Sequence, residues 1–157
     1  MAPDFRSNVY QQMEVTTANN LQLVVLLYEG AIRFLTEAKD LIEKRDLAGK
    51  AQAINRTFAI LGELQSTLEL EGGGEIAASL DRLYIYMMDR LLEASRCLNV
   101  DPLDEVIKLL RLLNSAWIEI AQETDKVAAL TLESPLSTVP HQTGRTQLSQ
   151  HPLEVVA

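Results

Sequence analysis

Cysteine, histidine and long apolar runs are all scarce in this sequence of 157 residues. Its single cysteine, Cys97, has no partner for an intramolecular disulfide, which excludes a disulfide-stabilised extracellular scaffold. The longest uninterrupted apolar run, LVVLL at 23–27, is far shorter than the roughly 20 residues that cross a bilayer. The first residues, MAPDFRSNVYQQ, lack the apolar region of a secretory signal. We therefore expect a protein of the reducing cytosol.

The shortage of histidine also restricts the chemistry of the chain. Both histidines, His141 and His151, lie near the C-terminus, so no Glu-x-x-His pair is available for a metal site in a helical bundle. Serine and cysteine nucleophiles lack a histidine base for the same reason. We expect Cys97 to be a small core residue, and we expect no enzyme activity, no cofactor and no metal.

The charge distribution limits the partners and separates two parts of the chain. The formal net charge of −8 and the absence of a Lys/Arg cluster argue against nucleic acid and against direct binding to an anionic membrane. Residues 126–157 carry two basic and two acidic residues and three of the five prolines, and half of them are Ser, Thr, Pro, Gln, His or Gly. We expect this segment to be a mostly disordered tail, although its pattern also allows a short extra helix at 126–132.

Residues 1–125 are predicted to form one all-α domain. Apolar residues recur there at alternating spacings of three and four, as they do on one face of a helix. In the first segment the series is Leu21, Val24, Tyr28, Ala31, Leu35, Ala38 and Ile42. The predicted helices span about 20–44, 47–71, 75–99 and 102–125, with Asn19, Asp46 and Asp101 as N-caps. Because the connections are short, we expect an antiparallel up-down-up-down four-helix bundle.

The stretch EGGGEI at 71–76 is either an anion-binding loop or a turn. A phosphate loop follows a strand, whereas the preceding stretch has a helical pattern and Glu75 places a negative charge where a phosphate would bind. We therefore interpret Gly72, Gly73 and Gly74 as a helical hairpin. Gly72 and Gly73 are expected to close the second helix with left-handed backbone angles, and Glu75 suits the N-terminus of the third helix.

The predicted helices carry more apolar surface than a bundle core requires. The stretch LQLVVLLYEGAIRFL at 21–35 is apolar on almost every side, and LYIYMM at 83–88 places two tyrosines and two methionines on neighbouring faces. These faces are covered either by a fifth segment or second subunit, or by a partner that binds in a hydrophobic groove. The pattern alone leaves both alternatives open.

Three stretches resemble a known family. LLYEGAIRFLTEA at 26–38, GGEIAASLDRLYIYMMDRLLEA at 73–94 and SAW at 115–117 are similar, in the same order, to the flagellar secretion chaperones of the FliS family. The resemblance implies an antiparallel helical bundle that holds the disordered C-terminal segment of flagellin in the cytoplasm. It implies that this segment is kept from polymerising, that it remains competent for type III export, and that a membrane-embedded component of the export gate is a second partner.

The resemblance also suggests which residues carry the binding. We expect the flagellin groove to be formed by apolar residues of the first and third helices, namely Leu23, Leu27, Ile32, Tyr84, Met87, Met88 and Leu91. An N-terminal tyrosine motif lies over part of this groove in the family, so Val9 and Tyr10 are expected to fold back as a gate, the alternative being a hydrophobic staple on the bundle. We expect a monomer or weak dimer when free. The alternative is a self-associating structural bundle or a regulatory adaptor.

Overall fold

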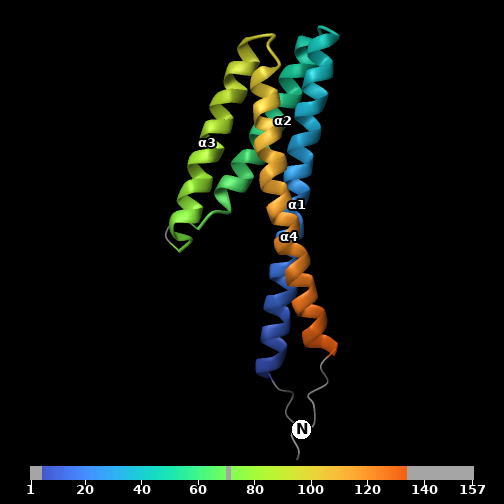
Figure 1. Ribbon diagram of the computed structural model, residues 1–157, viewed down its shortest axis with the longest axis vertical. Helices are drawn as coiled ribbons and strands as arrows, with labels where there is room; N and C mark the ends of the chain where they lie inside the picture. Colours follow the sequence, from blue (N-terminus) through green and yellow to red (C-terminus); the bar gives the residue numbers. More distant parts are fainter. Residues whose placement is uncertain (1–4, 70–71, 134–157) are drawn as a thin grey trace, which may run out of the picture.

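Four α-helices make up this computed structural model, which describes residues 5–69 and 72–133. The helices are α1 (Phe5–Glu43), α2 (Leu47–Ser66), α3 (Gly74–Arg96) and α4 (Asp101–Glu133), and no strand occurs in those two ranges. The chain runs up α1, down α2, up α3 and down α4 (Figure 1). The prediction of an all-α, antiparallel four-helix bundle is confirmed.

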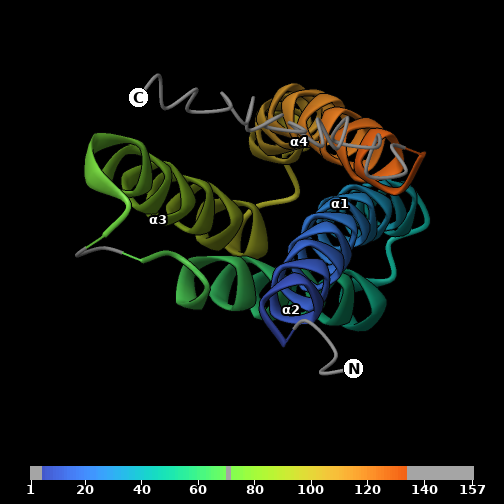
Figure 2. The ribbon, with the colours of Figure 1, turned by 90° about the horizontal axis from the view of Figure 1, so that it is seen from below.

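The four helices are not equally close to one another. α1 packs along α2 and α4, and α3 packs along the same two helices, so that α1 and α3 lie diagonally across the bundle. Seen from below, α1 lies between α2 and α4, while α3 stands on the open side (Figure 2). Towards the α2–α3 connection α3 leans away from α4, and the lower halves of α1 and α4 continue beyond it (Figure 1). The bundle is therefore tight at one end and open at the other.

The core is built from the apolar stripes that the sequence predicts. Its large side chains, all almost completely buried, come from every helix: Tyr28, Leu35, Ile54, Leu61, Leu64, Tyr84, Met87, Leu91, Leu103, Val106 and Leu110. Burying a side chain of this size contributes roughly 1.5–3 kcal/mol to stability. Packing of these stripes, rather than intrinsic helix propensity, supplies most of the stability of the helices.

The first and last helices are longer than expected. α1 begins at Phe5 instead of near residue 20, so that Asn19, expected as an N-cap, lies inside the helix. Residues 5–29 contain neither proline nor glycine, and asparagine costs a helix less than 1 kcal/mol, too little to stop one that packs on a core. α4 likewise continues past residue 125 to Glu133, two residues before Pro135. The remainder of the predicted tail, 134–157, lies outside the described residues.

The glycine hairpin lies between α2 and α3, but two of its glycines have other roles than those expected. α2 ends at Ser66 with Thr67 as its C-cap in the right-handed region, so Gly72 and Gly73 do not close it. The hydroxyl of Thr67 donates a 2.7 Å hydrogen bond to the carbonyl of Leu64 in the last turn of α2. The helix therefore ends before the glycines are reached.

Two of the glycines are required by the geometry of the α3 start. Gly74 has a φ of +60°, which glycine adopts without strain. A Cβ on Gly73 would lie 2.6 Å from the carbonyl oxygen of Glu69 and 2.5 Å from Cβ of Ala77. At Gly73 the backbone lies too close to Glu69 and Ala77 for a side chain. At Gly74 it adopts left-handed angles, so the hairpin needs glycine at both positions.

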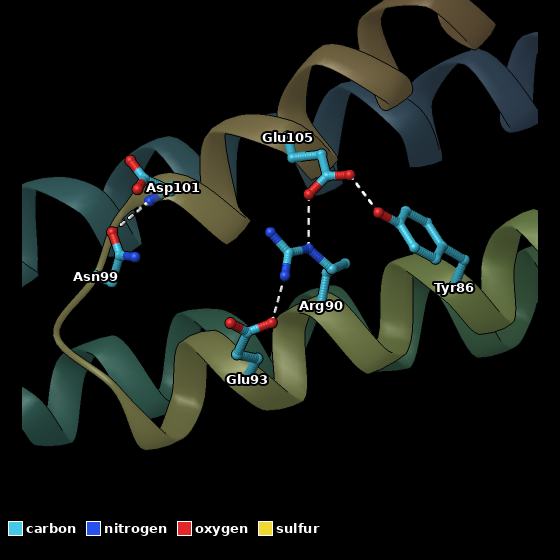
Figure 3. Close-up of polar contacts among 6 residues, drawn as sticks. All are labelled: Tyr86, Arg90, Glu93, Asn99, Asp101 and Glu105. Atoms are coloured by element: carbon cyan, nitrogen blue, oxygen red, sulfur yellow. Dashed lines mark hydrogen bonds and ion pairs between the residues drawn. The ribbon is translucent and has the colours of Figure 1, made fainter.

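The other helix ends show how local side chains set the boundaries. Asp46 is the N-cap of α2, as predicted, and its Oδ1 accepts a 2.9 Å hydrogen bond from the backbone N–H of Gly49. Glu75 lies in the first turn of α3, where its negative charge interacts favourably with the helix dipole. Asp101, expected as the N-cap of α4, is instead its first residue, and Asn99 Oδ1 accepts a hydrogen bond of 3.0 Å from its N–H (Figure 3).

Cys97 is exposed, so the expectation that it is a core residue is wrong. The physical reason is that α3 ends at Arg96, which leaves Cys97 beyond the last turn in an extended conformation. Its carbonyl oxygen accepts a 2.8 Å hydrogen bond from Nζ of Lys50, an almost completely buried lysine of α2. A cation at a helix C-terminus interacts favourably with the helix dipole, so this contact fixes the end of α3 to α2.

Replacing Arg45 by glycine is expected to raise the free energy of unfolding by about 0.5–1 kcal/mol. Arg45 has a φ of 57° in the α1–α2 turn, a conformation that is unfavourable for a residue with a Cβ. Its N–H bonds the carbonyl of Ile42 and the N–H of Asp46 bonds that of Leu41, the pattern of a helix C-cap that prefers glycine. Urea unfolding of Arg45→Gly and of Lys44→Gly tests this. Lys44→Gly should not stabilise, and an equal gain in both variants would contradict the assignment.

Candidate functional site

The described residues do not include a metal-binding cluster. Within residues 5–69 and 72–133, no three His, Cys, Asp or Glu side chains lie close enough together to hold a metal ion. None of the described helices has a stretch long and apolar enough to cross a membrane. The features that stand out are instead apolar surfaces between helices.

The principal candidate site is a cleft of about 390 Å³ at the open end of the bundle. All four helices contribute to it, and its lining is mostly apolar: Leu21, Leu23, Val24 and Leu27 of α1, Leu64 of α2, Leu68 in the α2–α3 connection, Tyr84 of α3, and Trp117 of α4. Thr17, Asn20, Glu63 and Thr67 supply the polar part of its lining. We call this set of residues the inter-helix cleft. A concave apolar surface with a few polar groups is the usual form of a binding site.

A buried pair of tyrosines underlies the cleft. The hydroxyl groups of Tyr28 and Tyr84 lie 2.5 Å apart, which joins α1 and α3 across the bundle diagonal. Burial raises the pKa of Tyr28, against smaller opposing effects of hydrogen bonds to Tyr84 and Trp117. Burial also raises the pKa of Tyr84, and its hydrogen bond to Tyr28 adds to the shift. Both phenols therefore lose their protons only at a higher pH than an exposed tyrosine does. Among the described residues that line the cleft, Glu63 is the acidic side chain.

Three of the seven predicted groove residues meet in this cleft, and four do not line it. Leu23, Leu27 and Tyr84 line the cleft, and Leu23 is 55% exposed at its rim. The other four lie in or against the core: Met87 and Leu91 are completely buried, and Ile32 and Met88 are partly buried. In this conformation Leu23 is the most accessible of the three, Leu27 is partly buried, and Tyr84 is an almost completely buried core residue at the base of the cleft.

The predicted gate residues Val9 and Tyr10 lie in the first turns of α1. The backbone continues there as a helix, instead of folding back onto the bundle as expected. Positions 10 and 23 are thirteen residues apart, so they are separated by roughly 20 Å along the helix axis, at 1.5 Å per residue. The N-terminal segment therefore leaves the wall formed by Leu23 and Leu27 uncovered in this structure.

The sequence interpretation missed the contribution of α2. Leu64 of α2 and Leu68, which follows the end of that helix, form one wall of the cleft, together with Trp117 from α4. Leu61, Leu64 and Leu68 are spaced by three and four, which is the signal that could have identified this wall. Trp117 also packs against the core, so it serves both the bundle and the cleft.

Two further grooves run along α4. One, of about 410 Å³ between α3 and α4, includes Ile76, Leu80, Leu83 and Leu113 in its lining. The other, of about 320 Å³ between α1 and α4, includes Val25, Leu26 and Ile118. The surplus apolar residues of the stretch 21–35 therefore face two surfaces: Leu23 and Leu27 line the inter-helix cleft, and Val25 and Leu26 line the α1–α4 groove.

A polar seam holds the closed end of α3 to α4 (Figure 3). Arg90 Nε lies 2.6 Å from Oε2 of Glu105, and the same guanidinium pairs with Glu93. Tyr86 donates a hydrogen bond to Glu105, and this bond, together with Arg90, holds the pKa of the Glu105 carboxyl below its usual value. Exposed ion pairs contribute little stability, typically about 0–1 kcal/mol, but they fix where α3 stays close to α4. The cleft lies on the other side of this seam, where α3 leans away.

Comparisons with known proteins give a consistent result. The family model described as "Flagellar protein FliS" matches residues 3–124, which include all of α1, α2 and α3 and most of α4. The flagellar secretion chaperone FliSB of Pseudomonas aeruginosa is 38% identical over 112 residues, covering 69% of this chain and 89% of that protein. The flagellar secretion chaperone FliS of Campylobacter jejuni is 36% identical, over 72% of this chain and 88% of the relative. That of Salmonella typhimurium is 34% identical, over 73% and 86%.

Proposed function

This chain belongs to the FliS family of flagellar secretion chaperones, and from that premise we propose that its inter-helix cleft binds the C-terminal segment of flagellin. As a member of this family the chain is a chaperone and not an enzyme. The observation that carries the proposal is an apolar cleft of about 390 Å³ that is open to a ligand and lined by all four helices. The site offers apolar burial and no catalytic group, as binding of an unfolded apolar segment requires.

The proposed mechanism is protection by burial. The terminal segments of flagellin bury apolar faces against one another in the filament, so a free monomer exposes surfaces that associate. A chaperone that covers such a surface lowers the concentration of the free form by mass action. Each client side chain that becomes fully buried contributes roughly 1.5–3 kcal/mol. The client loses chain entropy on binding, which moderates the affinity and favours its release.

Release completes the proposed cycle. The client, held unfolded in the cytosol, is delivered to a membrane-embedded component of the export gate and passes into the type III export channel. The chaperone contributes no covalent step or nucleotide hydrolysis, so the affinity of the cleft must be high enough to protect and low enough to release. A site that buries a few apolar side chains at one end of a bundle meets both conditions better than a fully enclosed pocket.

A direct test is light scattering coupled to size exclusion, on the chain alone and with a peptide of the flagellin C-terminal segment. We expect a 1:1 complex with the peptide. A dimer that persists unchanged in the presence of the peptide would instead support the self-associating bundle. In that case the α3–α4 groove, with Ile76 at 76% exposure, would be the first surface to examine.

Replacing Leu23 by glutamate is expected to weaken flagellin-peptide binding about 10-fold or more, while the melting temperature stays unchanged. The reason is that Leu23 lies at the cleft rim and is already 55% exposed. A charge there weakens peptide binding, because the peptide would bury it, but leaves the stability of the fold unchanged. Isothermal titration calorimetry and thermal unfolding measure the two effects.

A matched control for this variant is Leu26→Glu. Leu26 lies on the same helix and is 61% exposed, but it lines the α1–α4 groove rather than the cleft. It should leave peptide binding within about twofold of the unmodified chain. If Leu26→Glu weakens binding as much as Leu23→Glu does, the client binds the α1–α4 side and the cleft assignment is wrong.

A further inference from the structure

We propose that the last six residues of this chain, PLEVVA at 152–157, bind in the inter-helix cleft and compete there with an incoming client. The proposal rests on the cleft being the client site, as argued above, but its first test does not involve flagellin. It assigns an occupant to the cleft within the same chain. It also gives a role to the segment beyond Glu133, where the described helices end.

The cleft has room for such an occupant because the N-terminal segment does not cover it. α1 continues as one helix from Phe5, so its first turns are directed along the helix axis and not over Leu23 and Leu27. The apolar walls are thus available to another extended segment. An apolar segment that is tethered near such a cleft has a high effective concentration there, which favours its binding.

Chain length determines which part of the C-terminal segment can reach Trp117, the α4 wall of the cleft. Trp117 lies 16 residues before Glu133 on α4, a distance of about 24 Å along the helix. Leu136 and Val139 follow Glu133 by three and six residues, and a fully extended chain of six residues spans at most about 22 Å. Neither can reach Trp117. The apolar residues that can are Leu148, Leu153, Val155 and Val156.

The linker length also favours the last six residues. Eighteen residues, 134–151, separate Glu133 from Pro152. A random coil of that length has a root-mean-square end-to-end distance of about 21–25 Å, which matches the distance to Trp117. Effective concentration is highest when the two lengths match, and reaches the millimolar range. Even a weak apolar contact is then substantially populated.

Composition and charge agree with this assignment. PLEVVA concentrates three aliphatic side chains, Leu153, Val155 and Val156, in four positions. The whole formal net charge of −8 resides in residues 1–125, while the segment after Glu133 has one acidic and one basic residue, Glu154 and Arg145. The C-terminal segment is therefore not repelled by the acidic bundle, as a strongly acidic competitor would be.

The test uses the fluorescence of Trp117, the only tryptophan of the chain and part of the cleft lining. In the full-length double variant Val155→Asp, Val156→Asp, we expect Trp117 emission at longer wavelength and acrylamide quenching at least about twofold stronger, because the cleft is emptied. Val139→Asp is the matched control, since it adds a charge to the same segment at a position too close to Glu133 to reach Trp117. It should leave the spectrum unchanged. Identical spectra and quenching in all three proteins would overturn the proposal.

Two further outcomes have definite meanings. A difference that disappears on a hundredfold dilution would show that the occupant is the C-terminus of a second copy, which also overturns the proposal. In the second arm, the double variant should bind the flagellin peptide about 2- to 10-fold more tightly, since the competing segment is present at an effective millimolar concentration. A fluorescence change without any peptide binding would preserve this inference and refute the proposed function. If the unmodified chain and the double variant bind the flagellin peptide with equal affinity and have the same fluorescence, this inference is refuted and the proposed function is preserved.

Discussion

Replacing Leu91 by alanine is expected to lower the free energy of unfolding by about 2–5 kcal/mol. Leu91 is completely buried in the core of the bundle, so the substitution loses apolar transfer energy and leaves a cavity that its neighbours fill only in part. The native state remains populated at low temperature, since small domains are stable by about 5–15 kcal/mol. Urea unfolding measures the loss of stability, and calorimetry below the transition should show flagellin-peptide binding within about twofold of the unmodified chain.

The neighbouring residue provides the control. Leu92 follows Leu91 on α3 and is 43% exposed, so Leu92→Ala should change the free energy of unfolding by no more than about 0.5 kcal/mol. The pair therefore separates burial from position along the helix. If Leu91→Ala spared the unfolding transition and abolished peptide binding, Leu91 would be a groove residue, as the sequence suggested. The core would then have to open when the client binds.

The arrangement of the helices was predictable because the core follows the helical period closely. In the first predicted helix the spacing of three and four placed Tyr28, Ala31, Leu35 and Ala38 on one face, and all four are completely buried. Asp46 was correctly identified as the cap of α2, since a short carboxylate before an apolar run has few other roles. Signals of this kind are local, and the tertiary structure preserves them.

Helix ends were less predictable, because weak local signals compete with packing. Asn19 has the chemistry of an N-cap, but it has no proline or glycine near it, and α1 continues through it. At the end of α2 the opposite happened: the helix ends at Ser66, before the glycines are reached. The free-energy differences at such positions are about 1 kcal/mol, which packing elsewhere in the helix easily outweighs.

The candidate site was the least predictable part, because core and cleft share one apolar stripe. Tyr84, Met87 and Leu91 lie on the same face of α3, and their sequence spacing cannot tell which of them a ligand could reach. What separates them is the point at which α3 leaves α4. The seam of Arg90 and Glu105 holds the helices together near Met87 and Leu91, while Tyr84 lines the cleft. That point depends on contacts between residues distant in sequence.

Raising the pH above 10 is expected to destabilise the protein through the buried tyrosine pair. The pKa values of Tyr28 and Tyr84 are raised in the folded state, first of all by burial, whereas in the unfolded chain both are about 10. Above pH 10 the unfolded chain loses these protons and the folded protein keeps them, so the unfolded state binds fewer protons and stability falls as pH rises. The stabilisation is complete below pH 10. The loss is up to about 1.4 kcal/mol per pH unit for each tyrosine that stays protonated in the folded state.

The double variant Tyr28→Phe, Tyr84→Phe isolates this effect from the titration of lysines and of the exposed Tyr86. Removing both hydroxyl groups removes both members of the hydrogen-bonded pair, so the variant should remain folded at neutral pH, and its stability should fall less steeply between pH 10 and 11 by as much as about 2 kcal/mol. The single variant Tyr84→Phe should cost about 1–3 kcal/mol at neutral pH, because it leaves the hydroxyl of Tyr28 without this partner. Urea unfolding at pH 8, 10 and 11 measures all three proteins. Parallel pH dependence in the unmodified chain and the double variant would show that the two phenols titrate normally, and hence that water reaches them through the cleft.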